Sequence, residues 1–429
     1  MKKIACIACS ALLLLSMTLG LVACGAKPAQ PQQHPSGITQ TGDLMKDITA
    51  RTPEGVGDLT ADSAVLTDFA VRLFQAGQRG GENSLVSPLS VLCALAMTAN
   101  GAQGETRAQM EEVLGMKAEE LNEYLYTYMR DLPSDEKYKL DLANSIWFTD
   151  NESFTVNRDF LQTNADYYGA DLYKAPFNDA TCKAINDWVN EKTDGMIPQI
   201  LDRIPADAVM YLVNALAFEA EWAEPYLEHQ VREGDFRLSL DEAETVEFLY
   251  DREHAYLETD NATGFLKYYM GGQYAFAALL PNEGVTVTEL VNSLDGAQLH
   301  ELLNHPVSVP VDTAIPKFET KYDVELSEAL ADMGMPLAFD GGRADFTALG
   351  TADENIYISR VLHKTFISVT EQGTKAGAAT VVEMAKNTSI GPGFDEVKQV
   401  YLDRPFVYML VDMRTGTPFF IGTMMDPAA

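Results

Sequence analysis

The chain has 429 residues, of which 46% are hydrophobic, and its 63 acidic residues outnumber 31 basic ones to give a formal net charge of -32. This apolar content is enough for one large core or for two or three ordinary domains, and it excludes a chain that is disordered by composition. The negative charge is spread along the chain and argues against nucleic-acid binding, which needs a basic surface.

The first residues, MKKIACIACSALLLLSMTLGLVAC, predict an export signal. Lys2 and Lys3 give a basic start, and the apolar stretch after them is too short for a retained transmembrane helix. The ending LVAC resembles the bacterial lipobox, in which the cysteine is lipidated and becomes the mature N-terminus. We therefore expect a lipoprotein signal peptide over residues 1–23 and a lipid on Cys24 that holds the protein at a membrane surface. Ordinary cleavage after Ala23 is the alternative.

Residues 24–58 predict a flexible tether between this anchor and the rest of the chain. They are rich in Pro, Gln, Gly and Thr and contain few residues that could be buried. The pattern is globular over residues 59–429, with neither a second linker nor an internal repeat, which predicts a single domain. Cys93 and Cys182 are the only cysteines left after the signal and Cys24, so we expect no disulfide framework.

Hydrophobic spacing predicts both helices and strands within this domain. Helices are expected over Ala64–Gln75, after the Ser87-Pro88 pair and over Ala180–Val189. The run VMYLVNALAF, residues 209–218, is apolar on both alternating faces, as in a strand buried inside a sheet. Further strands are predicted at 274–280, 362–370, 406–411 and 418–424. Because helices come first and strands crowd the end, we expect an α+β fold.

The usual catalytic signatures are missing from the sequence. It contains neither a GxSxG elbow nor a phosphate-binding GxxxxGK[ST] motif. His300 and His305 are five residues apart, which places them about 140° apart around a helix and prevents them from sharing a zinc ion as a zinc helix requires. We therefore expect no enzyme, no metal site and no other cofactor.

A series of longer motifs runs in order from about residue 62 to the C-terminus. They are NSLVSPLS from Asn83, NGAQGETRAQM from Asn100, ANSIWF from Ala143, INDWVNEKTDGMIPQIL from Ile185, LVNALAFEAEW from Leu212, LLPNE from Leu279, PKFE from Pro316, LADMGMPLAFDGGRADFTAL from Leu330, SRVLHKTFISVTEQGTKAGAAT from Ser359 and DRPFVYMLVDMRTGTPFFIGTM from Asp403. Together these motifs resemble the serpin family. The resemblance implies three β-sheets, eight to nine helices and an exposed reactive-centre loop, here at about residues 371–400.

The resemblance also implies a function as a monomeric extracellular suicide substrate. A target serine protease, or a cysteine protease, cleaves the loop and becomes acylated. The cleaved loop then inserts into the central sheet and traps the protease in a covalent complex. A non-inhibitory binding or scaffold protein on the same fold, at the cell surface, is the alternative.

The first part of the loop has the alternation that insertion requires. A strand that enters the middle of a sheet must place small side chains on its inward face. The inward set that begins at Thr374 is small and uncharged and consists of Thr374, Ala376, Ala378 and Thr380. By resemblance, the hinge also includes Glu371, Gly373 and Ala379. Lys375 and Gly377 depart from the family pattern, but both lie in the outward set.

The position of the reactive bond stays open between two neighbours. Family spacing places it at Asn387-Thr388, whereas the cation of Lys386 favours a cut at Lys386-Asn387 by a trypsin-like protease. Met384 is a lesser option, suited to an elastase-like protease.

The resemblance further implies two groups of residues that control opening of the central sheet. Ser87, Ser90, Asn214 and His363 correspond to a polar cluster, the shutter, where the strands separate. Trp222 and an ion pair between Lys317 and Glu371 correspond to the breach, where the loop enters. None of these residues is expected to be catalytic.

Overall fold

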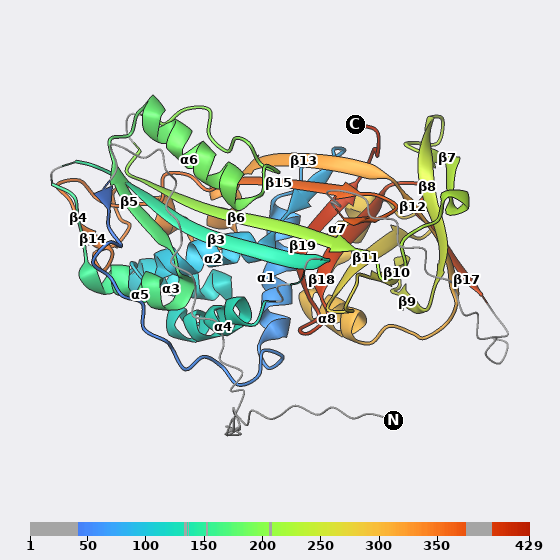
Figure 1. Ribbon diagram of the computed structural model, residues 1–429, viewed down its shortest axis with the longest axis horizontal. Coiled ribbons are helices and arrows are strands. Elements are labelled where there is room, and N and C mark those ends of the chain that lie inside the picture. Colours follow the sequence, from blue (N-terminus) through green and yellow to red (C-terminus); the bar gives the residue numbers. More distant parts are fainter. Residues whose placement is uncertain (1–41, 133–134, 136, 152, 206–207, 375–396) are drawn as a thin grey trace, which may run out of the picture. The chain divides into compact units, whose positions relative to one another are not determined.

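Three large sheets and nine α-helices make up the described part of the chain (Figure 1). The computed structural model describes residues 42–132, 135, 137–151, 153–205, 208–374 and 397–429. All of these residues belong to one compact unit. The predicted α+β class and the expected three sheets with eight to nine helices are confirmed.

The largest sheet, sheet A, has seven strands. Their order across the sheet is β1 (Gly42–Asp43), β5 (Asp171–Ala175), β3 (Tyr138–Thr149), β6 (Met210–Glu221), β16 (Gly373–Thr374), β15 (Leu362–Val369) and β13 (Phe318–Glu325). Neighbours pair antiparallel except β3 and β5, which are parallel. Strands distant in the sequence therefore lie side by side, so the sheet cannot be completed by local pairing alone.

Sheets B and C form the other end of the fold. Sheet B has the order β2 (Ser84–Val86), β19 (Thr417–Met424), β18 (Phe406–Asp412), β11 (Tyr274–Pro281), β10 (Ala262–Tyr268) and β9 (Ala255–Glu258). Sheet C has the order β17 (Lys398–Tyr401), β12 (Val311–Pro316), β8 (Ala243–Glu253) and β7 (Val231–Arg237). A short ribbon joins β4 (Thr155–Val156) to β14 (Gly350–Thr351).

The helices and strands predicted from hydrophobic spacing are all present. The helices are α1 (Ser63–Ala76), α2 (Pro88–Ala99), α3 (Gly104–Leu114), α4 (Ala118–Arg130), α5 (Arg158–Tyr168), α6 (Asp179–Lys192), α7 (Val287–Ser293), α8 (Gly296–Asn304) and α9 (Ser327–Asp332), with 3-10 turns at Glu228–Gln230 and Pro336–Phe339. Ser87 caps α2 by accepting a hydrogen bond from the Ser90 backbone, and Pro88 opens the helix, as predicted. The expectation that helices precede strands is only partly right, because α7, α8 and α9 lie in the second half.

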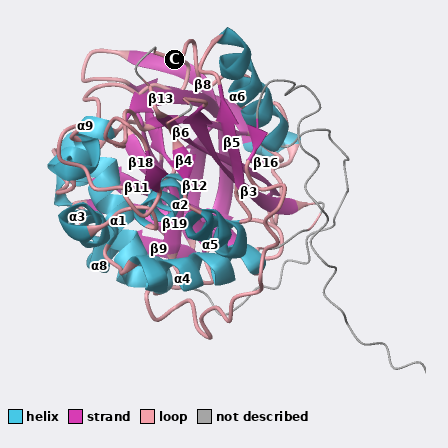
Figure 2. Ribbon diagram, turned by 90° about the vertical axis from the view of Figure 1, so that its left-hand side faces the viewer, coloured by secondary structure: helices cyan, strands magenta, loops and turns pink. Residues whose placement is uncertain are grey.

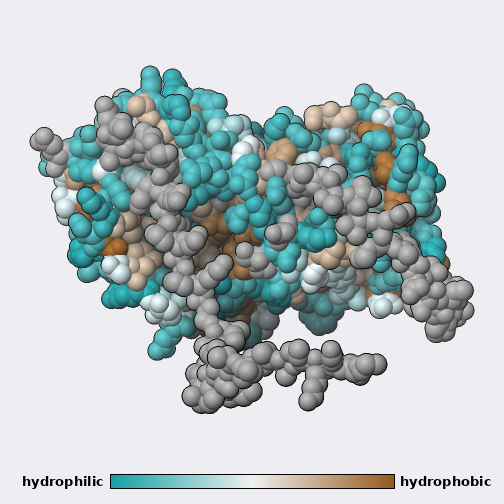
Figure 3. Space-filling model, viewed as in Figure 1, coloured by the Kyte–Doolittle hydropathy of each residue, from teal (hydrophilic) through white to brown (hydrophobic). Residues whose placement is uncertain are grey.

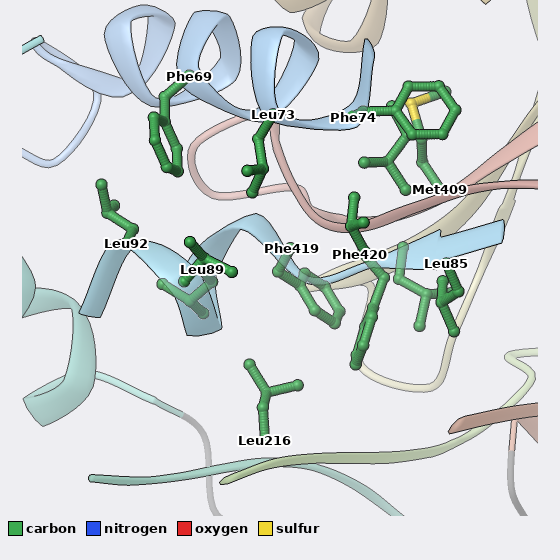
Figure 4. Packing of buried hydrophobic residues seen from close by; sticks show 14 of the residues in the cluster. Phe69, Leu73, Phe74, Leu85, Leu89, Leu92, Leu216, Met409, Phe419 and Phe420 are labelled. Atoms are coloured by element: carbon green, nitrogen blue, oxygen red, sulfur yellow. The ribbon is translucent and has the colours of Figure 1, made fainter. Parts of the chain in front are cut away.

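Helices cover both faces of sheet A, which explains why β6 is apolar on both sides. Figure 2 shows most helices gathered on one side of the strands and α6 on another. Leu212 and Leu216 of β6 belong to the main core. Figure 4 shows Leu216 facing side chains of α1, α2 and sheet B. Tyr211 and Val213, the alternate residues, pack instead beneath α6 with Trp188. The predicted buried strand is confirmed with its two-sided pattern.

The last part of the predicted tether belongs to the folded body. Gly42 and Asp43 extend sheet A by pairing with β5. Farther along, the Arg51 backbone and guanidinium both donate to the Asp166 carboxylate, at 2.6 and 2.9 Å. The dark-blue segment in Figure 1 passes α5 and α4 on its way to α1. The tether boundary at residue 58 was therefore wrong, because the partners of residues 42–58 lie far away in sequence and composition does not reveal them.

The surface agrees with the acidic composition. Hydrophilic residues cover most of the described face in Figure 3. Over the described ranges, no helix combines the length and the apolar character that a bilayer span requires.

The packing of residues 42–58, which we call the docked segment, against the folded body can be tested. Arg51→Ala removes the cation that faces the nearly buried Asp166 carboxylate, whose side chain is only 5% exposed. We expect proteases to cut residues 42–58 of this variant several-fold faster than in the native protein, because the segment spends more time detached. Lys46→Ala, which removes an exposed cation from the same segment, is the control and should change the rate little. Equal cutting rates for the two variants would contradict the account.

Candidate functional site

The candidate site lies where the chain leaves sheet A for the reactive-loop segment. β16 is the two-residue continuation of the chain after β15, and it pairs with β15 on one side and β6 on the other. Thr374 lies opposite both Ala220 and Val369. No pairing joins β6 directly to β15 over the residues that the structure describes. Gly373 and Thr374, near the beginning of the loop, therefore occupy the strand position between β6 and β15.

The two residues of β16 fit this position closely. A Cβ on Gly373 would lie 2.0 Å from the Ala220 carbonyl oxygen, so only glycine lets the two backbones approach in this way. Thr374 is 2% exposed, and its hydroxyl forms a hydrogen bond with the Tyr269 hydroxyl beneath the sheet. Thr374 therefore points inward, on the face that the alternation assigned to it.

Three hydrogen bonds from one segment hold the turn that precedes β16. The Trp222 backbone N–H donates to the Gln372 carbonyl, and its indole N–H donates to the Thr370 carbonyl, each at 2.9 Å. The Tyr226 backbone N–H donates to the Glu371 carbonyl at 2.9 Å. We call residues 222–226 the hinge clasp. Trp222, predicted from resemblance, thus contacts the loop directly, whereas sequence reasoning missed Tyr226.

The predicted pair Lys317 and Glu371 lies beside the hinge clasp. Lys317 Nζ is 3.1 Å from Glu371 Oε2 and 3.0 Å from Glu247 Oε2. Although partial burial acts in the opposite direction, the two carboxylates raise the pKa of Lys317. The ion pair therefore joins the hinge to sheet C, where Glu247 lies in β8.

Three of the four predicted shutter residues lie together. Ser87 and His363 are buried, and the Ser87 backbone N–H donates to His363 Nε2 at 2.9 Å. Ser90 completes the group through its backbone bond to the Ser87 hydroxyl at 3.3 Å. Because Nε2 accepts a hydrogen bond, the imidazole is neutral, and complete burial lowers its pKa to about 4.

Asn214 lies in β6 and has a different partner. Its amide donates to the Asn144 side-chain oxygen in β3, which lies directly opposite in the sheet. The Asn214 side-chain oxygen has no hydrogen-bond partner among the described residues. Asn214 is thus bonded toward β3, whereas His363 is bonded to Ser87. Asn144 was missed as a site residue, because its position opposite Asn214 depends on strand register.

Several predicted site residues lie outside the described part of the chain. They are Cys24, Ala376, Ala378, Ala379, Thr380, Lys386, Asn387 and Thr388. Their roles stay predictions.

The buried histidine predicts a specific pH dependence. At a pH between 6.5, the ordinary pKa of histidine, and about 4, its pKa in the folded protein, His363 is protonated in the unfolded chain but neutral in the folded protein. Above about pH 6.5 the free energy of unfolding therefore does not depend on the titration of His363, and it decreases as the pH falls from 6.5 toward 4. Between pH 7 and pH 5, His363 should reduce the free energy of unfolding by about 2 kcal/mol.

His363→Gln, which keeps a hydrogen-bond acceptor but does not titrate, should lack this part of the loss. Urea denaturation of both proteins at the two pH values measures the difference. An equal loss in both would show that His363 does not contribute it.

Comparisons with known proteins agree with this geometry. A family model described as Serpin (serine protease inhibitor) matches residues 64–427. An uncharacterized serpin-like protein of Thermococcus kodakarensis is 28% identical, with 84% of this chain and 85% of the relative covered. The leukocyte elastase inhibitor of Equus caballus is also 28% identical, with 85% of this chain and 99% of the relative covered.

Solved structures are similar in fold over nearly the same length. The thermophilic serpin tengpin in its native state is 45% identical, with a TM-score of 0.85 and coverage of 90% of this chain and 100% of that chain. Tengpin in its latent state is 43% identical, with a TM-score of 0.76 and coverage of 87% and 99%. With this sheet order, this hinge and these matches, the chain belongs to the serpin family.

Proposed function

We propose that this protein inhibits extracellular serine proteases as a suicide substrate. A protease would cleave the reactive loop, and the loop would then insert into sheet A and trap the acyl-enzyme. The observation that carries the proposal is the position of Gly373 and Thr374, which already pair with both β6 and β15. Insertion would extend a strand that has begun, on the same face and in the same register.

The hydrogen bonds formed by such an extension would supply a free energy comparable to the stability of a whole domain. About ten new backbone hydrogen bonds, at roughly 0.5 to 1.5 kcal/mol each, would contribute on the order of 10 kcal/mol. Typical stabilities of whole domains are about 5 to 15 kcal/mol. Serpin loop insertion is itself an established example of strand addition, so the mechanism comes from the family, and the small inward residues of this loop support it.

The proposed targets follow from the loop sequence. Lys386 would direct a trypsin-like protease, whereas family spacing favours Asn387-Thr388 as the reactive bond. A named inhibitory relative, the horse leukocyte elastase inhibitor, supports a serine protease as the partner class. Cysteine proteases are a further class to test. We also propose that the protein is exported, that Cys24 carries a lipid and that the protein acts as a monomer.

Mixing the protein with a panel of serine and cysteine proteases tests the proposal. We expect at least one protease to form a covalent complex that survives SDS and boiling. Mass spectrometry of the peptide released from the complex identifies the bond as Lys386-Asn387 or Asn387-Thr388. Cleavage of the loop by every protease in the panel, without complex or inhibition, would instead indicate a non-inhibitory binding or scaffold protein.

A substitution in β16 tests insertion separately from cleavage. Thr374→Arg would place a charge at a position that is 2% exposed, so the loop should insert too slowly to trap the protease. We expect more than about tenfold less covalent complex, and cleaved protein in its place, since a barrier increase of about 1.4 kcal/mol already gives a factor of ten. Lys375→Arg, which keeps the cation at the next position, is the control. Undiminished trapping by Thr374→Arg would contradict insertion on this face.

A further inference from the structure

A buried ammonium group lies directly behind the hinge clasp. Lys267 of β10 has a side chain that is only 3% exposed. Its Nζ lies 2.7 Å from Glu253 Oε1 and 3.4 Å from Asp251 Oδ2, both in β8. The same Nζ lies over the ring of Tyr226, 4.4 Å from its centre, and 5.6 Å from the ring centre of Trp222. We call these five residues the Lys267 cluster.

The environment of this ammonium is largely dry. Tyr226 is buried, and burial raises the pKa of the Glu253 carboxyl even though Lys267 lies beside it. A cation is attracted to the face of an aromatic ring, and the attraction is stronger where water is excluded. Lys267 therefore binds two carboxylates and two ring faces at once.

The Tyr226 ring contacts the Lys267 ammonium and packs edge-on against Trp222. Its hydroxyl is buried and has no hydrogen-bond partner among the described residues, so no polar bond at the far end of the side chain orients the ring. The backbone N–H of the same residue holds the Glu371 carbonyl. Tyr226 therefore links the Lys267 ammonium, through its ring, to the hinge turn, through its backbone N–H.

The carboxylates of the cluster connect it to the other end of the reactive loop. Asp251 of β8 lies opposite Thr313 of β12, and Thr313 lies opposite Val400 of β17. The Thr313 hydroxyl also donates to the Asp251 carbonyl at 3.2 Å. β17 is the strand to which the chain returns after the loop. One row across sheet C therefore leads from Lys267 to the distal end of the loop.

We propose that Lys267 is a positioning residue that fixes the hinge clasp, and with it the start of the inserting strand, relative to sheet C. The ammonium holds the Tyr226 and Trp222 rings on one side and Asp251 and Glu253 on the other. Removal of the cation would free the clasp and loosen the turn over residues 370–372. The consequence for trapping rests on the proposed inhibitory function, but the effect on the clasp does not.

Amide hydrogen exchange, which needs no protease, provides the primary test. In Lys267→Gln, the amides of Trp222 and Tyr226 should exchange about tenfold faster, because they are the donors to residues 371 and 372. Amides in β11 report global opening and should change little. Lys267→Arg keeps a cation that can bind the carboxylates and stack on the rings, and it should restore exchange to within about twofold of the native rate.

Two further variants keep the test decisive if Lys267→Gln does not fold. Tyr226→Leu removes the ring but keeps the ion pairs, and it should give the same local increase in exchange. Arg414→Met breaks another partly buried ion pair, with Asp412, in contact with the Tyr128 ring, and it should leave the two clasp amides unchanged. Unchanged exchange at Trp222 and Tyr226 in both Lys267→Gln and Tyr226→Leu, or an equal increase in Arg414→Met, would overturn the proposal.

If inhibition is established, Lys267→Gln should also increase the share of loop cleavage that escapes trapping, and Lys267→Arg should not. An absence of inhibition in the native protein would refute the proposed function and leave the exchange result to decide the role of Lys267. An exchange increase without any change in trapping would limit Lys267 to holding the clasp and would overturn its link to the inserting strand.

Discussion

The pairing of Gly373 and Thr374 with both β6 and β15 is the contact on which the rest of the site depends. It places Gly373 and Thr374, near the start of the loop, in the middle of a sheet that is covered by helices on both faces. Only a glycine permits the approach to Ala220, and the buried Thr374 hydroxyl bonds to the Tyr269 hydroxyl. The remaining site residues either hold this turn in place or line the strands beside it.

The predicted shutter residues form two separate hydrogen-bonded groups. Ser87 and His363 form one bonded group, and Asn214 with Asn144 forms another. The Ser87 backbone N–H and the Asn214 amide N–H each have a partner within their own group, so separation of β6 from β15 would leave these two donors bonded. Beside β16, Lys317 and the Lys267 cluster connect the hinge to sheet C through ion pairs.

Local patterns in the sequence predicted the helices and strands that depend on neighbouring residues. The two-sided apolar run of β6 and the cap at Ser87 were visible because both depend on neighbouring residues. Contacts between distant segments were not visible. Arg51 and Asp166 are 115 residues apart, which is why the docked segment was mistaken for tether. The sequence gives no sign that Lys267 is buried, because its two carboxylate partners lie in β8, 14 and 16 residues away.

Thermal unfolding of intact and cleaved protein tests the central claim most directly. A metalloprotease that cuts within residues 381–396 forms no acyl-enzyme and therefore releases cleaved protein for comparison. If the loop extends β16 into sheet A, the cleaved protein should unfold about 20 °C or more above the intact protein, given roughly ten added hydrogen bonds. A cleaved protein that unfolds at or below the temperature of the intact protein would contradict the account.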